Sequence, residues 1–257
     1  MNAGTLALYG ALRAASVFVR RVPVRVSYAL ASVVGLLAYC LFPLPRRAID
    51  ANLRVALPEA GRRRRAALAR SAFRTDALNW VDTLRIPSLA DEDIARMASV
   101  RDWDLVDRSL SHNRGLIMLT MHLGNFDLVG QLLSATGHRV TVPVERMRPE
   151  RLFRFLVAQR ASKGISIVPM DGAARLLLAA LRRGEIVGLA ADRNIQGRSV
   201  QVELFGRATE LPAGPAALAR HTGAPVLLGI GLRADDYRYV GIVRGPIPME
   251  RTGDAAR

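Results

Sequence analysis

The feature that most constrains the fold is the alternation of short apolar strands with helical segments that begins at residue 115. Each apolar run is followed by a turn and then by a stretch with helical periodicity. The expected strands cover residues 115–121, 140–144, 165–169, 186–191, 226–232 and 237–243, and the expected helices cover 126–134, 149–163, 172–183 and 213–222. This alternation indicates an α/β fold, with a central, mostly parallel sheet and helices on both faces.

A different pattern precedes this region. Residues 1–25 carry four arginines among apolar residues, and residues 26–45 contain no charged side chain. A bilayer span needs about 20 mostly apolar residues, so the run is barely long enough. Arginines flank it on both sides, whereas a spanning helix usually has a one-sided basic bias. We therefore expect residues 1–45 to form a membrane-associated helical segment that lies on an anionic bilayer surface, and residues 46–257 to form the α/β domain.

The charge balance indicates an anionic partner. The chain has 37 basic and 22 acidic side chains, a formal net charge of +15, and Lys163 is its only lysine. Arginine forks suit phosphate oxygens. Aromatic residues make up only 5% of the chain and no nucleic-acid-binding motif is present, so we expect no nucleic-acid partner. A non-catalytic basic protein that binds a membrane or a nucleic acid stays the remote alternative.

The candidate chemistry lies where two expected strands end. His122 follows the strand at 115–121, and Asp127 comes five residues later, beyond a turn. Asp192 and Arg193 follow the strand at 186–191, and the carboxyl ends of parallel strands meet at one edge of a sheet. A carboxylate that binds one imidazole nitrogen leaves the other free to take a proton. Either Asp127 or Asp192 could therefore make His122 a general base.

The sequence lacks the residues that several other kinds of site require. No second histidine lies at helical spacing from His122, so a zinc site is not expected. There is no Gly-x-Ser-x-Gly elbow, Walker loop or complete dinucleotide fingerprint, which disfavours serine hydrolases, nucleotide-triphosphate enzymes and ordinary dehydrogenases. Cys40 lies inside the apolar run and is expected to pack, not to act as a nucleophile.

The segment His122-Leu-Gly-Asn-Phe-Asp127 resembles the H-x-x-x-x-D motif of the bacterial lipid A biosynthesis acyltransferase family. Further segments resemble the family pattern in the same order, at residues 46–53, 144–146, 164–169, 191–193, 202–206 and 211–217. Within the family, the string from Glu145 to Glu150 looks nearest to the phosphatidylinositol mannoside acyltransferases of actinobacteria.

The resemblance implies transfer of a fatty acyl group from a thioester donor, acyl-CoA or acyl carrier protein, to a sugar hydroxyl of a membrane glycolipid. The favoured acceptor is a phosphatidylinositol mannoside; the alternative is late acylation of lipid A with acyl carrier protein. No cofactor beyond the co-substrate is implied. The implied location is the cytoplasmic face of the cytoplasmic membrane, as a peripheral or monotopic protein. Relatives usually continue with a further helix beyond the position of Arg257, so we expect this chain to be shortened at its C-terminus.

The resemblance also implies roles for individual residues. His122 matches the catalytic base and Asp127 the motif carboxylate, and Asp192 stands where the mannoside branch has a glutamate that pairs with the histidine. The residues expected to contact the substrate are Asn125, Glu145, Arg146, Arg160 and Arg193. The oxyanion that develops during transfer would be held by backbone N–H groups of the 123–126 turn or by Arg193.

Overall fold

The computed structural model describes residues 3–194, 199–234 and 236–249, and its contacts divide the chain into two compact units. The first unit contains the helices up to Ser88 together with Leu204–Arg207. The second contains Leu89–Glu203 and the chain from Ala208 onward. The expected boundary at residues 45 and 46 concerns which residues contact the membrane, and it stays a prediction.

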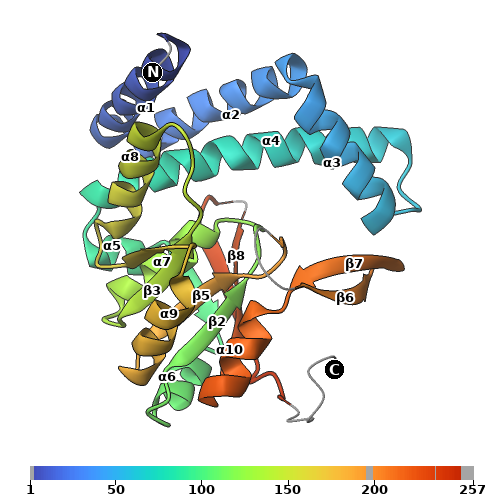
Figure 1. Cartoon of the computed structure of the whole chain (residues 1–257). Helices are drawn as coiled ribbons and strands as arrows, with labels where there is room; N and C mark the ends of the chain where they lie inside the picture. The colour runs from blue at the N-terminus through green and yellow to red at the C-terminus, as the bar shows by residue number, and fades with distance from the viewer. Residues whose placement is uncertain (1–2, 195–198, 235, 250–257) are drawn as a thin grey trace. The chain divides into compact units, whose positions relative to one another are not determined.

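The first unit is helical (Figure 1). Its elements are α1 (Ala3–Arg21), α2 (Val24–Leu41), α3 (Pro43–Ala56), α4 (Arg62–Arg85) and a 3₁₀ turn, η1 (Ile86–Ser88). Prolines suit the first turn of a helix, where their missing N–H is not needed, and α3 begins with one. The uncharged run at 26–45 therefore forms most of α2 and the start of α3, two helices that meet at Phe42.

Helix α2 packs closely along α4. A β-carbon added to Gly35 would lie 2.7 Å from the backbone oxygen of Phe73, so only glycine permits this approach. Farther along the same contact, the Tyr28 hydroxyl donates a 2.5 Å hydrogen bond to the fully buried carboxylate of Asp82. A buried carboxylate is stable only when it is hydrogen-bonded or paired, so this contact fixes α2 against α4.

The second unit contains a seven-stranded sheet in the order β1-β9-β8-β2-β5-β3-β4 and most of a two-stranded sheet of β6 and β7, whose turn at Leu204–Arg207 belongs to the first unit. Its strands are β1 (Ala98–Arg101), β2 (Leu116–Thr120), β3 (Val140–Val144), β4 (Ser166–Pro169), β5 (Ile186–Ala190), β6 (Ser199–Leu204), β7 (Arg207–Pro212), β8 (Val226–Arg233) and β9 (Tyr239–Arg244). Its helices are α5 (Asp91–Arg96), α6 (Asp104–Leu110), α7 (Phe126–Ala135), α8 (Glu150–Ala161), α9 (Ala173–Arg182) and α10 (Gly214–Thr222).

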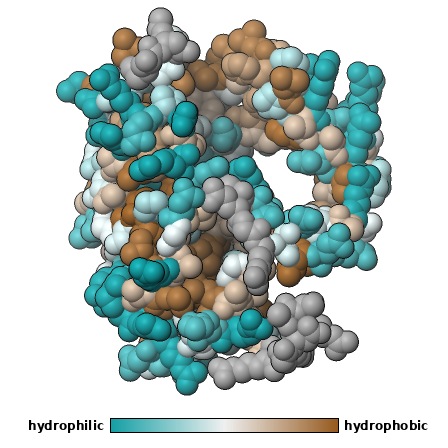
Figure 2. Space-filling model, viewed as in Figure 1, coloured by the Kyte–Doolittle hydropathy of each residue, from teal (hydrophilic) through white to brown (hydrophobic). Residues whose placement is uncertain are grey.

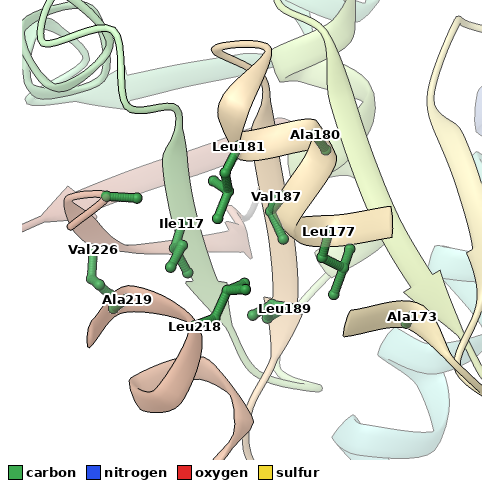
Figure 3. Close-up of a cluster of buried hydrophobic side chains, with 11 residues drawn as sticks. Ile117, Ala173, Leu177, Ala180, Leu181, Val187, Leu189, Leu218, Ala219 and Val226 are labelled. Atoms are coloured by element: carbon green, nitrogen blue, oxygen red, sulfur yellow. The ribbon is translucent and has the colours of Figure 1, made fainter. Parts of the chain in front are cut away.

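The sheet is mostly parallel, as the sequence predicts. Strands β2, β3, β4, β5 and β8 run in one direction, and β8 pairs antiparallel with β9. Successive strand residues point to opposite faces, so each strand serves two hydrophobic clusters. Ile117, Val187 and Leu189 pack with α9 and α10 (Figure 3). The residues next to them, Leu116 and Ile186, pack in a second cluster with Val106 of α6 and Leu133 of α7.

Three strands were not expected from the sequence. Strand β1 is a four-residue segment that pairs with β9, about 140 positions later in the chain. Strands β6 and β7 form a hairpin whose turn places Phe205 and Gly206 at positive φ. Tight hairpin turns favour Asn-Gly or Asp-Gly at such positions, so Phe-Gly carries a weak turn signal.

Candidate active site

The register of two neighbouring strands brings the candidate base to its carboxylate. Strands β2 and β5 are parallel, and Thr120 lies opposite Ala190. His122 and Asp192 each stand two residues beyond this pair. The Nδ1 atom of His122 lies 2.8 Å from Asp192 Oδ1, and the backbone N–H of His122 donates to Asp192 Oδ2 at 3.0 Å. One carboxylate thus fixes both the ring and the backbone of His122.

The electrostatics of this pair determine which imidazole nitrogen of His122 can act as the base. Partial burial of Asp192 would raise the pKa of its carboxyl group, but the side-chain and backbone hydrogen bonds from His122 outweigh burial and lower that pKa. The carboxylate is therefore ionised at neutral pH and only accepts, so Nδ1 carries the hydrogen. Nε2 is then the basic nitrogen. Both side chains are about one-third exposed, which leaves Nε2 accessible to a ligand.

Asp127 pairs with Arg160 and not with His122. Arg160 Nε lies 2.8 Å from Asp127 Oδ1, and an Nη group donates to Oδ2 at 3.2 Å. The ring of Phe126 packs against the His122 ring, with centroids 4.9 Å apart, and the Arg160 guanidinium lies 6.0 Å from the centre of the Phe126 ring. The sequence left open which of two carboxylates pairs with His122. In the structure Asp192 binds the imidazole, and Asp127 pairs with Arg160 instead.

The turn between His122 and α7 depends on close backbone contact with β8. Gly124 has φ +64°, and a β-carbon there would overlap the carbonyl oxygen of Gly231. The Asn125 N–H donates to that same oxygen at 3.1 Å, and the Asn125 side chain accepts from the N–H of Leu128 as the cap of α7. Asn125 Nδ2 also donates to the hydroxyl of Tyr239 at 3.0 Å.

A cavity of about 730 Å³ within the second unit opens beside this pair. Its polar lining includes His122, Asp127, Glu145, Arg160 and Arg193. The rest is largely apolar and comes from β2, α7, β3, β5, α9 and α10, with Met118, Leu133, Val142, Leu177, Leu189 and Leu218 among the contributors. This volume lies within the range of about 300–1,000 Å³ typical of small-ligand pockets.

Three of the five expected substrate contacts, Glu145, Arg160 and Arg193, line the cavity. The structure places the other two elsewhere. Asn125 is 3% exposed, with its side chain committed to the helix cap and to Tyr239, and it is not part of the lining. Arg146 is exposed on the loop after β3, also outside the lining.

Sequence reasoning missed three polar residues of the cavity wall, Thr120, Gln131 and His221, because none of them belongs to a motif. It also missed the wall position of Phe126, although that ring stands inside the H-x-x-x-x-D segment. Among the described residues, no group of three His, Cys, Asp or Glu side chains gathers as metal ligands would. The His122–Asp192 pair can take a proton from a hydroxyl beside a largely apolar cavity whose lining includes Arg160 and Arg193.

The chain is similar to one protein family and to curated relatives. The model of the family described as bacterial lipid A biosynthesis acyltransferase matches residues 7–257. A phosphatidylinositol mannoside acyltransferase of Mycolicibacterium smegmatis is 34% identical over 161 residues, which cover 61% of this chain and 53% of that protein. One of Mycobacterium tuberculosis is 32% identical over 154 residues, 58% of this chain and 49% of that protein. The aligned part thus spans about half the length of these curated relatives.

Proposed function

The chain belongs to the bacterial lipid A biosynthesis acyltransferase family, and from that premise we propose that it transfers a fatty acyl group from a thioester donor to a sugar hydroxyl of a membrane glycolipid. The observation that carries the proposal is the His122–Asp192 pair at the edge of a largely apolar cavity. A base beside an apolar space suits a reaction between a hydroxyl and a lipid-like acyl donor.

The reaction follows from the free imidazole nitrogen. His122 Nε2 takes the proton of the acceptor hydroxyl while that oxygen attacks the thioester carbonyl. The carbon–sulfur bond then breaks, the ester is formed, and the thiolate leaves and takes up the proton from the imidazolium. Asp192 keeps Nδ1 protonated and stabilises the imidazolium that forms in between. The hydroxyl attacks directly, so no acyl-enzyme intermediate and no enzyme nucleophile are needed.

Arg193 is the better candidate for holding the developing oxyanion. Two N–H groups of the 123–126 turn already have acceptors, because Leu123 donates to Met121 and Asn125 donates to Gly231. The Arg193 side chain lines the cavity next to Asp192 and has no carboxylate partner among the described residues. A guanidinium in this position can neutralise negative charge on the carbonyl oxygen during attack.

The acceptor that we favour is a phosphatidylinositol mannoside, since that is the acceptor class in the names of the two relatives above. Arg160 lines the cavity, is held there by Asp127, and is our candidate for binding an anionic headgroup. Glu145 lines the same cavity and offers a carboxylate to sugar hydroxyls. The second candidate is late acylation of lipid A with acyl carrier protein, which the family match equally supports.

Residues 1–45 are proposed to hold the protein at the cytoplasmic face of the membrane. Helix α2 is long and apolar enough to cross a bilayer by length and composition, which by itself is weak support for a span. Its partner α4 carries seven arginines, which are costly inside a bilayer. A helix packed along α4 is therefore better accommodated at the surface, with its apolar residues in the lipid.

Acyl transfer by membranes that contain the full chain tests the proposal. Labelled palmitoyl-CoA is offered with total polar lipid from the source cell, and carrier-protein-loaded donor is offered in parallel. We expect a labelled glycolipid with the unaltered chain and none with His122→Ala. His112→Ala is the matched control, because His112 is an exposed histidine outside the cavity lining. Full transfer by the His122→Ala variant would contradict the assignment of the base.

A further inference from the structure

The first unit concentrates the positive charge of the chain. Residues 1–88 contain 14 arginines and 4 acidic residues, a net charge of +10 out of +15 for the whole chain. Two of the four carboxylates are already engaged within the unit. Asp50 pairs with Arg54 at 2.7 Å and with Arg65 at 2.9 Å, and Asp82 is buried against the hydroxyl of Tyr28. Four carboxylates cannot pair with 14 arginines, so this unit attracts anions from outside it.

Three of the remaining arginines are fixed along one flank of α2. Arg46 of α3 and Arg70 of α4 both lie beside the ring of Tyr39, with guanidinium carbons 5.3 and 5.8 Å from its centre. The edge of that ring packs on Phe73, with centroids 5.7 Å apart. One turn farther along α4, Arg74 donates from Nε to the Ser32 hydroxyl at 3.1 Å. Arg46 and Arg70 thus share one ring, whereas Arg74 is held at Ser32, seven residues before Tyr39 on α2.

None of Arg46, Arg70 and Arg74 pairs with a carboxylate in the part of the chain that the structure describes. Holding like charges together is unfavourable unless an anion compensates them. A guanidinium that stacks on an aromatic ring keeps the N–H groups at its edge available, and these match phosphate oxygens in two-point contacts. The cluster therefore has the chemistry of a phosphate-binding site.

The exposed apolar surface of the α2–α3 junction suggests which phosphate the cluster takes. Leu37, Leu41, Phe42 and Leu44 are 55%, 70%, 57% and 73% exposed. Figure 2 shows hydrophobic surface gathered over the end of α2 and the beginning of α3. An exposed apolar patch rimmed by cations suits a molecule with an anionic head and an apolar body.

We propose that Tyr39, Arg46 and Arg70 form a binding site for the phosphate groups of anionic phospholipids in a bilayer, with the apolar residues at the α2–α3 junction in the acyl region. This inference deepens the membrane part of the proposed function. It rests on that function for one point, that the protein lies on the surface of a bilayer. The site takes headgroups at the Tyr39 cluster, whereas the remaining arginines of the unit contribute general attraction.

Vesicle flotation with the full chain tests the site. The vesicles are phosphatidylcholine with or without phosphatidylglycerol. The site variant is Arg46→Gln/Arg70→Gln, and the control is Arg62→Gln/Arg63→Gln, which removes the same charge from exposed arginines of the same unit. We expect the site variant to bind anionic vesicles at least tenfold more weakly than the control variant, and the two to bind neutral vesicles equally. Equal losses on anionic vesicles would overturn the site in favour of diffuse charge.

A second pair of measurements separates shape from charge and lipid from free phosphate. Arg46→Lys/Arg70→Lys keeps the charge but not the planar fork, so we expect binding to fall at least threefold; full binding would overturn a built site. Inorganic phosphate should displace the protein no better than chloride at equal ionic strength. Stronger displacement by phosphate would assign the cluster to a free anion and overturn the lipid assignment.

Acyl transfer to detergent-dispersed acceptor distinguishes this inference from the proposed function. We expect the Arg46→Gln/Arg70→Gln variant to keep its transfer rate in detergent, where no bilayer is needed. Its melting curve, compared with that of the control variant, shows whether both fold. Acyl transfer without selective vesicle binding would overturn the lipid site and leave the proposed function standing. Selective vesicle binding without transfer from any donor would overturn the proposed function and leave the lipid site standing.

Discussion

At the scale of single residues, the pairing of His122 depends on the length of the acidic side chain at position 192. The resemblance to the mannoside branch implies a glutamate at position 192, and the chain has the shorter aspartate. Because β2 and β5 are in register, the backbone N–H of His122 also reaches this carboxylate, and the shorter side chain meets Nδ1 at 2.8 Å. The close register compensates for the missing methylene.

Replacement of this carboxylate should reduce catalysis more than it reduces substrate binding. We expect Asp192→Asn to lower kcat by about 10²–10⁴-fold, because the amide can no longer stabilise the imidazolium or fix the ring with Nδ1 protonated. Asp192→Glu should keep more activity than Asp192→Asn, since the charge is retained. Steady-state kinetics on both variants measure the split between kcat and KM. A kcat for Asp192→Asn equal to that of the unaltered chain would exclude an orienting role.

The sequence could place His122, Asp127 and Asp192 at one edge of the sheet, because strand ends are readable from apolar runs. It could not decide between the two carboxylates. That choice depends on Arg160, which lies 33 residues beyond Asp127 and pairs with it through two contacts. Local spacing contains no information about such a competing partner. The burial of Asn125 likewise depends on Gly231 and Tyr239, more than 100 residues away.

At the scale of elements, the strands that the sequence predicted are those with continuous apolar runs, and α7 to α10 agree within a few residues with the expected helices. The missed elements lack such a signal. Strand β1, Ala-Ser-Val-Arg, has half-buried residues alternating with exposed ones and exists through its pairing with β9. Tertiary pairing, not local preference, determines such edge strands.

The turn before α7 should tolerate no side chain at position 124. We expect Gly124→Ala to destabilise the second unit by more than about 3 kcal/mol and to reduce activity, because its β-carbon overlaps Gly231 in a left-handed backbone. Gly137→Ala is the matched control: φ is also positive there, but no atom lies within 4 Å, so about 1–2 kcal/mol of strain is expected. Urea denaturation of both variants measures the difference. Equal losses would exclude the contact with β8 as the cause.

Glu185, the residue before β5, should make the stability of the fold depend on pH. The hydrogen bond from Arg183 lowers the pKa of its carboxyl group; burial opposes this, and the Thr141 hydroxyl adds to the lowering. A lowered pKa contributes stability that is present above the unfolded value, about 4.5, and is lost as pH falls through the folded value.

We therefore expect Glu185→Gln to cost at most about 1 kcal/mol at pH 7, because it removes the charge that Arg183 stabilises and Arg183 is half exposed and screened. The difference from the unaltered chain should shrink between pH 5 and pH 3. Urea denaturation at several pH values measures it. A difference that grows toward acid pH would show that the sign is wrong.

At the scale of the whole molecule, charge and apolar surface gather in the same helical unit, so they should contribute separately to membrane attachment. Raising salt from about 0.05 to 0.5 M shortens the screening length severalfold and should weaken binding to anionic vesicles. Binding should not vanish, because Leu41 and Leu44 are more than two-thirds exposed and insert regardless of salt. Flotation of Leu41→Asn/Leu44→Asn measures this: we expect little binding left at high salt. Unchanged salt-resistant binding would assign insertion to other residues.

The strand order has a consequence for how the protein is made. Strand β5 lies between β2 and β3, yet it is synthesised after both of them and after β4. Strands β2 and β3 must therefore stay apart, or separate again, when residues 186–190 are added between them. Such late insertion between existing neighbours slows folding and exposes unpaired edges in the meantime. Asp192 arrives with the inserted strand, so a chain still emerging from the ribosome holds His122 without its carboxylate and becomes competent only as the sheet closes.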